Sequence, residues 1–242
     1  MVQCSITEVE RFISGMKNPV KLLRGCTIFN KEEPRDLAYI VARKIISERP
    51  DSVYHIVAGV KILLLIWNIV YIRFLPTKTR QDLEEDLVKA YEKARNDIEV
   101  LSDKRLQSID LQDPTVIDRI DAIFRCFREY DSIGVTGASK TLHLIRPSFF
   151  VMWDGEIRKN YHKLHQNRRH TIDECYVDFM KQTQQIAKGL LLQRSAEEIW
   201  TAYPIHSTEP QLVEEFSEAS VKSLPKMIDE CNYVRFRLGQ DF

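Results

Sequence analysis

Lys140 and Asp154 are the two residues of this chain whose types and setting best fit covalent chemistry. Lys140 follows a glycine-containing stretch, 134–139, and Asp154 follows an aromatic run, 149–153. Glycine adopts backbone angles that are closed to other residues, so this stretch can turn sharply and pass close to a ligand. An amine and a carboxylate that meet in one cleft can attack a cationic carbon and stabilise its charge. The segment 118–165 is therefore the candidate for a hairpin and a catalytic site.

The residues after the glycines predict a short helix that carries the lysine. From Ser139 onward the apolar residues fall at helical spacing, until Pro147 prevents continuation. We expect Lys140 in the first turn of this helix, where the positive end of the helix dipole lowers the pKa of a lysine and favours the neutral amine. Asp154 precedes a second helical pattern and is expected to be its N-cap.

Two other interpretations of this segment stay open from the residues alone. Lys140 could be a solvated surface lysine, with Asp154 an ordinary helix cap and the aromatic run part of the core. The stretch 134–141 also reads G-x-x-x-x-S-K-T, one residue short of a phosphate-binding loop. Such a loop must follow a buried strand, whereas residues 118–130 carry their apolar side chains at helical spacing, which disfavours it.

The order of helix, glycine hairpin and helix resembles the helix-hairpin-helix DNA glycosylases, the HhH-GPD superfamily, whose motif runs Leu-Pro-Gly-Val-Gly-x-Lys-Thr. By position, Lys140 matches the lysine nucleophile of the bifunctional members and Asp154 matches their catalytic aspartate. The chain departs from the motif, because it lacks the proline and has an extra residue between Gly137 and Lys140. The run 137–154 is also similar to a family of uncharacterised prokaryotic proteins that reads Gly-Ala-x-Lys-x-Leu-His-Leu-x-x-Pro-x-x-Phe-x-x-Trp-Asp.

The resemblance implies base-excision repair of double-stranded DNA that carries a damaged or mismatched base. The base would be flipped out of the duplex, Asp154 would stabilise the sugar cation, and Lys140 would capture C1′ as a Schiff base before strand cleavage. No cofactor and no metal are expected, and the protein would act as a monomer. The rival from another class is a non-catalytic helical module that binds nucleic acid or protein through the same hairpin.

The residues expected to contact this substrate fall into two sets. The DNA backbone would be held by Gly134, Gly137, Ser139, Arg158, Lys159, Arg168 and Arg169, and the base pocket would be built from Trp67, Asn68, Trp153 and His143. The glycines would offer backbone amides to a phosphate, and an indole ring could stack on a base.

Charge supports only a local nucleic-acid surface. Lys plus Arg number 35 and Asp plus Glu number 35, so the chain has no net charge. Basic and titratable side chains gather after the aspartate, with no carboxylate between them, at Arg158, Lys159, His162, Lys163, His165, Arg168, Arg169 and His170. Such a run is usually a solvated face, but beside a lysine hairpin it favours contacts with phosphate.

Periodicity predicts an all-α fold over residues 1–242, either as one helical unit or as two interleaved lobes. Helices are expected at 34–49, 53–75, 80–100, 114–130, 172–190 and 208–231. The apolar segment 53–75 is nearly long enough to span a bilayer, but polar residues such as Lys61 and Arg73 interrupt it. We expect it to be a central helix buried on most sides, with no membrane partner.

The five cysteines are scattered and show no C-x-x-C spacing. This pattern favours reduced thiols in a cytoplasm and disfavours a zinc or iron–sulfur site. The polar start of the chain lacks the pattern of a signal peptide.

Overall fold

The computed structural model describes residues 5–165, 176–203 and 223–242. Within these residues the chain is predominantly helical and has no strand, so the predicted all-α class is confirmed. The helices, in chain order, are α1 (Ile6–Gly15), α2 (Pro19–Glu32), α3 (Asp36–Glu48), α4 (Val53–Trp67), α5 (Ile69–Phe74), α6 (Thr77–Gln81), α7 (Leu83–Val100), α8 (Pro114–Arg128), α9 (Gly134–Ile145), α10 (Gly155–His162), α11 (Tyr176–Leu191), α12 (Ala196–Thr201) and α15 (Leu224–Tyr233). A short 3₁₀ turn, Lys163–His165, follows α10, and a π-helical turn, Val234–Leu238, follows α15.

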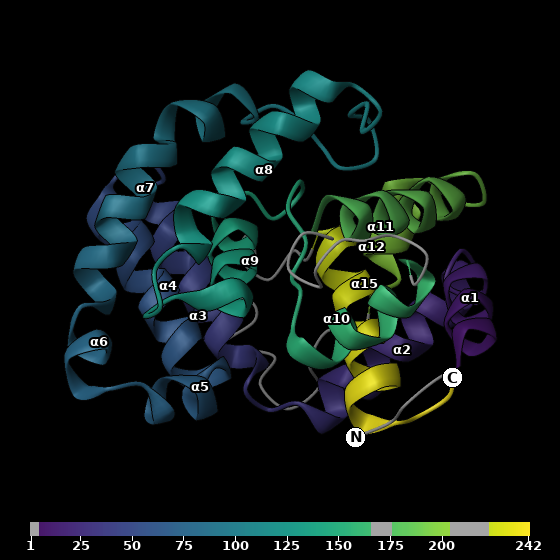
Figure 1. Ribbon diagram of the computed structural model, residues 1–242. Helices are drawn as coiled ribbons and strands as arrows, with labels where there is room; N and C mark the ends of the chain where they lie inside the picture. The colour runs from purple at the N-terminus through teal and green to yellow at the C-terminus, as the bar shows by residue number, and fades with distance from the viewer. Residues whose placement is uncertain (1–4, 166–175, 204–222) are drawn as a thin grey trace.

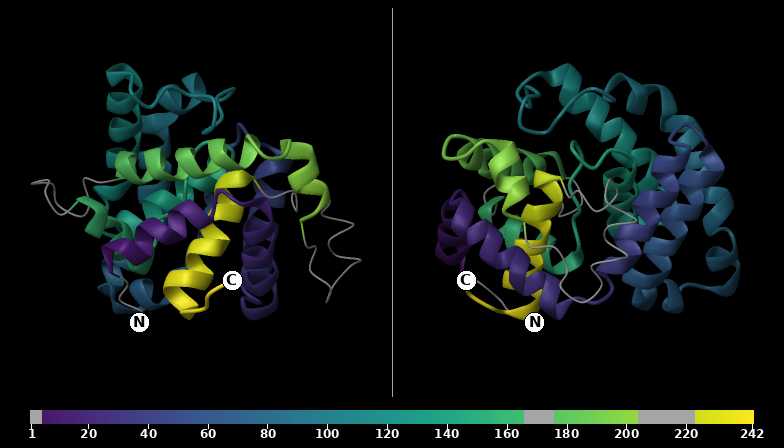
Figure 2. Two further views of the ribbon diagram at one scale, coloured as in Figure 1. Left: turned by 90° about the vertical axis from the view of Figure 1, so that its right-hand side faces the viewer. Right: turned by 180° about the vertical axis from the view of Figure 1, so that it is seen from behind.

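The helices form two groups (Figure 1). One group, on the left of Figure 1, is the continuous part of the chain from α3 to α9, in which α3 packs along α4, and α7 and α9 both pack on α8. The other group combines the two ends of the chain, because α2 packs along α15, and α11 also packs on α15. Figure 2 shows the same division from behind. The fold is therefore two-lobed, and one lobe is inserted in the sequence of the other.

The extended segment between α9 and α10 runs between the groups and packs against both. The Trp153 ring lies 6.4 Å from the ring of Phe124 on α8 and stacks on Phe179 of α11 at 5.9 Å. Tyr176 donates a hydrogen bond from its hydroxyl to the Val151 carbonyl at 2.9 Å. One hydrophobic core thus runs through both groups, and it fixes the segment that leads to Asp154.

Local sequence explains where several helices begin. Asn18 and Asp113 each accept a hydrogen bond from a backbone N–H of the helix that follows, and a proline occupies the first helical position after both. Ser223 caps α15 in the same way. Because Ser223 has extended backbone angles, α15 starts afresh at Leu224 and does not continue a helix from 208. The predicted helix 208–231 is therefore confirmed over 224–231 and interrupted at Ser223, and residues 208–222 lie outside the described residues.

The apolar segment 53–75 is two helices rather than one. α4 ends at Trp67, Asn68 breaks the helical path with φ −110° and ψ 17°, and the short α5 follows. The expectation of burial on most sides holds for α4 only, because Ile72 alone is buried in α5. Among the helices that the structure describes, none combines the length and the apolar character that a membrane span requires.

Candidate functional site

A cavity of about 50 Å³ lies where the two groups of helices meet, and both Lys140 and Asp154 line it. A single water molecule needs about 10–15 Å³ by the same measure, whereas pockets for small ligands usually enclose about 300–1,000 Å³. The other lining residues come from both groups and are Phe29, Glu33, Arg35, Trp67, Met152, Asp229, Tyr233 and Arg237. The two residues that the sequence singled out therefore face one small cavity.

Lys140 is buried, with 6% of its surface exposed. Its Nζ donates a hydrogen bond to Oδ1 of Asn68 at 2.7 Å and lies 5.4 Å from the centre of the Trp67 ring. Burial lowers the pKa of this lysine from 10.5 to about 8, although the carboxylates of Asp154 and Asp229 oppose the shift. At neutral pH about one Lys140 side chain in ten is then an uncharged amine, against about one in 2,500 for an ordinary lysine.

The sequence predicted a lowered pKa but gave the wrong cause. α9 begins at Gly134, so Lys140 lies in its second turn and not in the first. The field of a helix dipole falls off within the first turn, so removal of the amine from water dominates instead. The glycines suggested a turn up to Ser139, but the chain is already helical there, because Gly137 packs closely against Ile133 and is buried.

The break between α4 and α5 places Asn68 and Trp67 beside the lysine. Both were expected in the base pocket, but only Trp67 lines the described cavity, and Asn68 does not. Asn68 closes α4 with its backbone N–H, which donates to the Leu64 carbonyl at 2.8 Å, and its side chain is left to accept from Lys140. Trp67 is anchored by its Nε1, which donates to the Arg35 carbonyl at 2.8 Å. The amide of Asn68 satisfies one lysine proton without adding a negative charge.

Asp154 is the N-cap of α10, as predicted. Its Oδ1 accepts hydrogen bonds from the backbone N–H groups of Glu156 at 2.9 Å and Ile157 at 3.0 Å. Oδ2 makes no hydrogen bond with any residue that the structure describes. The carboxylate is thus held at a helix start with one oxygen left for a ligand.

Ser139 fixes the separation between the lysine helix and the aspartate. Its hydroxyl donates to the Thr136 carbonyl at 2.9 Å and accepts from the backbone N–H of Trp153 at 3.0 Å. Ser139 is fully buried, so it does not face solvent, where DNA would lie. The bond between Ser139 and Trp153 positions the two site residues, because Lys140 follows Ser139 in the chain and Asp154 follows Trp153.

Trp153 and His143, two of the expected pocket residues, do not line the described cavity. Trp153 is enclosed by aromatic rings of the core. His143 is fully buried, where its Nδ1 donates to the Phe150 carbonyl at 2.8 Å and its Nε2 accepts from the Tyr39 hydroxyl at 3.0 Å. Burial lowers the pKa of His143 to about 3. Packing accounts for both side chains, because Trp153 lies among aromatic rings of the core and both ring nitrogens of His143 are bonded to buried groups.

Gly134, the first glycine between α8 and α9, has a backbone conformation that other residues rarely adopt. Gly134 has φ +64°, and a Cβ there would lie 2.7 Å from the hydroxyl of Tyr71, so only glycine fits. Its backbone N–H donates to the Tyr130 carbonyl at 2.9 Å. This amide is consequently bonded inside the protein and is not open to a phosphate as the structure stands. The phosphate-binding loop is also excluded, because the helix α8 and not a strand precedes this stretch.

The expected basic surface is only partly described. Arg158 lies over the Trp153 ring with its guanidinium carbon 5.7 Å from the ring centre. Lys159 is exposed and pairs with Glu156 at 3.0 Å, so a carboxylate one turn earlier partly neutralises this stretch. Arg168 and Arg169 lie outside the described residues.

Residues of α15 complete the site, and the sequence did not single them out. Asp229 lines the cavity with 7% of its surface exposed. Burial raises its pKa from 3.8 to about 7, and the neighbouring Lys226 opposes this shift. The signal in the sequence was three charged residues, Lys226, Asp229 and Glu230, in a stretch whose other residues are mostly apolar.

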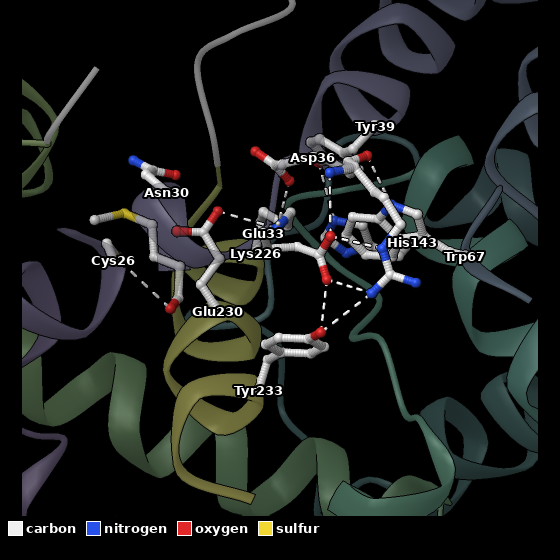
Figure 3. A network of polar contacts seen from close by, with 12 residues as sticks. Cys26, Asn30, Glu33, Asp36, Tyr39, Trp67, His143, Lys226, Glu230 and Tyr233 are labelled. Carbon is white, nitrogen blue, oxygen red and sulfur yellow. Dashed lines mark hydrogen bonds and ion pairs between the residues drawn. The ribbon is translucent and has the colours of Figure 1, made fainter. Parts of the chain in front are cut away.

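Next to the cavity, Lys226 forms a fully buried ion-pair network (Figure 3). Its Nζ lies 3.2 Å from Asp36 and 3.0 Å from Glu230, and all three side chains have no exposed surface. The ring of Trp67 lies 5.2 Å from the same Nζ. Burial alone would lower the pKa of Lys226, but the two carboxylates outweigh it and raise the pKa. Lys226 is therefore held in its charged form.

The mouth of the cavity carries charged side chains of both signs. Arg35 makes a two-bond ion pair with Glu33, whose other partner is the hydroxyl of Tyr233 at 2.6 Å. Arg237 is exposed and makes no hydrogen bond or ion pair with a described residue. Among the residues that the structure describes, no group of three His, Cys, Asp or Glu side chains could hold a metal ion.

Comparisons of the chain with protein-family models, with curated proteins and with solved structures found no match.

Proposed function

We propose that this protein is a DNA base-excision glycosylase with AP lyase activity, in which Lys140 is the nucleophile and Asp154 stabilises the sugar cation. One observation carries the proposal. A buried lysine whose pKa is lowered to about 8 shares a cavity with a helix-capping carboxylate, at the junction of two helical groups. The helices α8 and α9 and the short connection between them bring the lysine there, and this order of elements supports the proposal because it resembles the motif of the superfamily.

The chemistry follows from the protonation states of the two groups. The Nζ lone pair forms a bond to C1′ of the deoxyribose, the bond from C1′ to the base breaks, and its electron pair leaves with the base. The Asp154 carboxylate stabilises the positive charge that develops on the sugar. A proton then passes from Nζ to O4′, the C1′–O4′ bond breaks, and the nitrogen lone pair forms the C=N bond of a protonated Schiff base. Removal of a C2′ proton gives an alkene and expels the 3′ phosphate.

Substrate entry requires the cavity to widen. Its volume of about 50 Å³ is well below that of usual ligand pockets, which enclose about 300–1,000 Å³. Arg35, Glu33 and Tyr233 form a hydrogen-bonded cluster at its edge. Opening of this cluster would expose Lys140 and leave Arg237 to meet a phosphate.

Borohydride trapping tests the proposal. Duplexes that carry an abasic site, oxidised guanine, uracil or hypoxanthine would be incubated with wild type, Lys140→Met and Asp154→Asn. We expect a covalent adduct with the abasic duplex that disappears in Lys140→Met, and the best-trapped damaged base would name the substrate. Lys89→Met serves as the control. This lysine is exposed on α7, pairs with Glu85 and does not line the cavity.

Two results would contradict the proposal. An adduct that persists in Lys140→Met would place the nucleophile elsewhere. No adduct with any duplex would favour the non-catalytic module, which predicts DNA or protein binding that is indifferent to the Lys140 substitution.

A further inference from the structure

Asp229 is a buried carboxylate that the fold leaves without a partner. It makes no hydrogen bond or ion pair with any residue in the described part of the chain. Lys226, one turn earlier on α15, directs its Nζ to Asp36 and Glu230 instead. Its oxygens are not fully enclosed by protein, so the carboxylate faces the cavity that Lys140 also lines and is available there to a ligand or to a proton.

Charged groups face Asp229 from several elements. Lys226 and Glu230 lie on its own helix, Lys140 lies on α9, and Asp154 precedes α10. Arg35, Glu33 and Arg237 share the lining of the cavity. Among these groups, Lys140 is a cation whose only described hydrogen bond is to a neutral amide. Asp229 and Lys140 make no direct contact, but the cavity of about 50 Å³ that both line has room for a bridging water molecule. Their pKa values, about 7 and about 8, lie close enough for a proton to pass between them through such a water.

We propose that Asp229 is a third catalytic residue, which takes the ammonium proton from Lys140 and delivers it to the oxygen that leaves C1′. The inference rests on the proposed function, because it assigns the proton transfers of that same reaction. Its basis is the shared cavity and the unpartnered, buried carboxylate.

On an abasic sugar, each transfer can be written in balance. An N–H bond of the Lys140 ammonium breaks and an O–H bond forms on Asp229, which leaves a free amine. Nζ then bonds to the aldehyde carbon, the C=O π electrons move to oxygen, and that oxygen takes the proton from Asp229. Asp229 removes a second proton from Nζ and gives it to the departing hydroxyl, which leaves as water. A protonated Schiff base results, and Asp229 is again a carboxylate.

The test uses a duplex with a single abasic site, which needs no knowledge of the damaged base. The rate of borohydride trapping would be measured as a function of pH for wild type, Asp229→Asn and Asp229→Gly. We expect Asp229→Asn to slow trapping at neutral pH by about 100-fold or more, the usual effect of losing a general acid–base group. Added formate should restore trapping by about tenfold or more in Asp229→Gly, because it can occupy the vacated space and carry the proton.

A merely structural role predicts the opposite pattern. Without the Asp229 charge the pKa of Lys140 falls further, so more free amine is present and Asp229→Asn would trap as fast as wild type or faster. That result, or the absence of formate rescue in a folded Asp229→Gly, would overturn the inference. Asp241→Asn is the matched control, because this exposed carboxylate near the C-terminus pairs with Arg235.

Failure of the function and failure of the inference are distinguishable. If wild type forms no adduct with any duplex, the proposed function fails and the inference falls with it. If wild type forms an adduct that needs Lys140 but Asp229→Asn traps as fast as wild type, only the inference fails.

Discussion

Lys140 and Lys226 are two buried lysines on opposite groups of helices, and both lie close to the same Trp67 ring, at 5.4 and 5.2 Å. They differ in the groups that meet their charge. Lys226 has two carboxylates at 3.2 and 3.0 Å, whereas the described hydrogen bond of Lys140 goes to the amide of Asn68. The pKa of Lys226 is consequently raised, and that of Lys140 is lowered to about 8. Burial alone does not make a lysine reactive, because the nearest partner decides which form is held.

The largest expected contrast is in stability. Lys226→Met leaves Asp36 and Glu230 as buried charges without their cation, which should destabilise the protein by about 3–5 kcal/mol. Lys140→Met removes a costly buried charge together with one hydrogen bond, so its effect should stay within about 1 kcal/mol. Urea unfolding of both variants at neutral pH measures the difference. Equal destabilisation by the two substitutions would break the comparison.

The pH dependence of stability should reveal Lys140 directly. Its pKa is about 8 in the folded protein and 10.5 in the ordinary case. Between these values the unfolded chain binds the proton that the folded protein has lost, so stability rises with pH, by about 3 kcal/mol over the window. Urea unfolding of wild type and Lys140→Met from neutral to alkaline pH isolates this rise as a difference. A flat difference would mean that Lys140 keeps its proton.

Asn68→Asp should give Lys140 a carboxylate partner like those of Lys226. It places a carboxylate where the amide now accepts from Lys140 Nζ at 2.7 Å. The pKa of Lys140 should rise by about 2 units, so trapping of an abasic duplex at neutral pH should slow about 100-fold and recover at alkaline pH. Unchanged trapping would show that the neutral amide is not what keeps Lys140 reactive.

The smallest expected effect concerns the link between the two site residues. Ser139→Ala removes the acceptor of the buried Trp153 N–H, and should destabilise the protein by about 1–2 kcal/mol. Ser47→Ala is a suitable control, because its exposed hydroxyl bonds only to the Lys44 carbonyl of its own helix, and should cost less than about 0.5 kcal/mol. Thermal unfolding compares them. Equal effects would show that Ser139 does not tie Asp154 to the lysine helix.

Local patterns predicted the fold better than the site. Helices α3, α7 and α8 follow from the helical spacing of their apolar residues, and in α8 also from the N-cap Asp113, which immediately precedes the helix in the chain. The sequence placed the start of α9 at Ser139, because Gly134 and Gly137 suggest a turn. In the structure α9 starts at Gly134, and Tyr71 packs closely against this glycine. Such packing comes from distant parts of the chain and is not visible in local spacing.

The sequence predicted the part of the candidate site that comes from one continuous stretch of the chain, 118–165. Lys140 and Asp154 stand out because glycines and a cap mark them, and they do meet at one cavity. Asp229 and Lys226 belong to a helix that joins the site only through folding of the chain ends, so no spacing reveals them. Trp153 was assigned to the pocket on its type alone, and its partners Phe124 and Phe179 could not be read from sequence.

Peptide mapping of the trapped adduct tests the central claim most directly. Wild-type protein would be reduced with borohydride on an abasic duplex, digested, and analysed by mass spectrometry for the mass of the sugar remnant. We predict the added mass on Lys140 and none on Lys226, because the pKa of Lys140 is lowered to about 8 and that of Lys226 is raised, so only Lys140 has an appreciable fraction of free amine. A remnant on Lys226 or on another lysine, or no remnant at all, would contradict the assignment of Lys140 as the nucleophile.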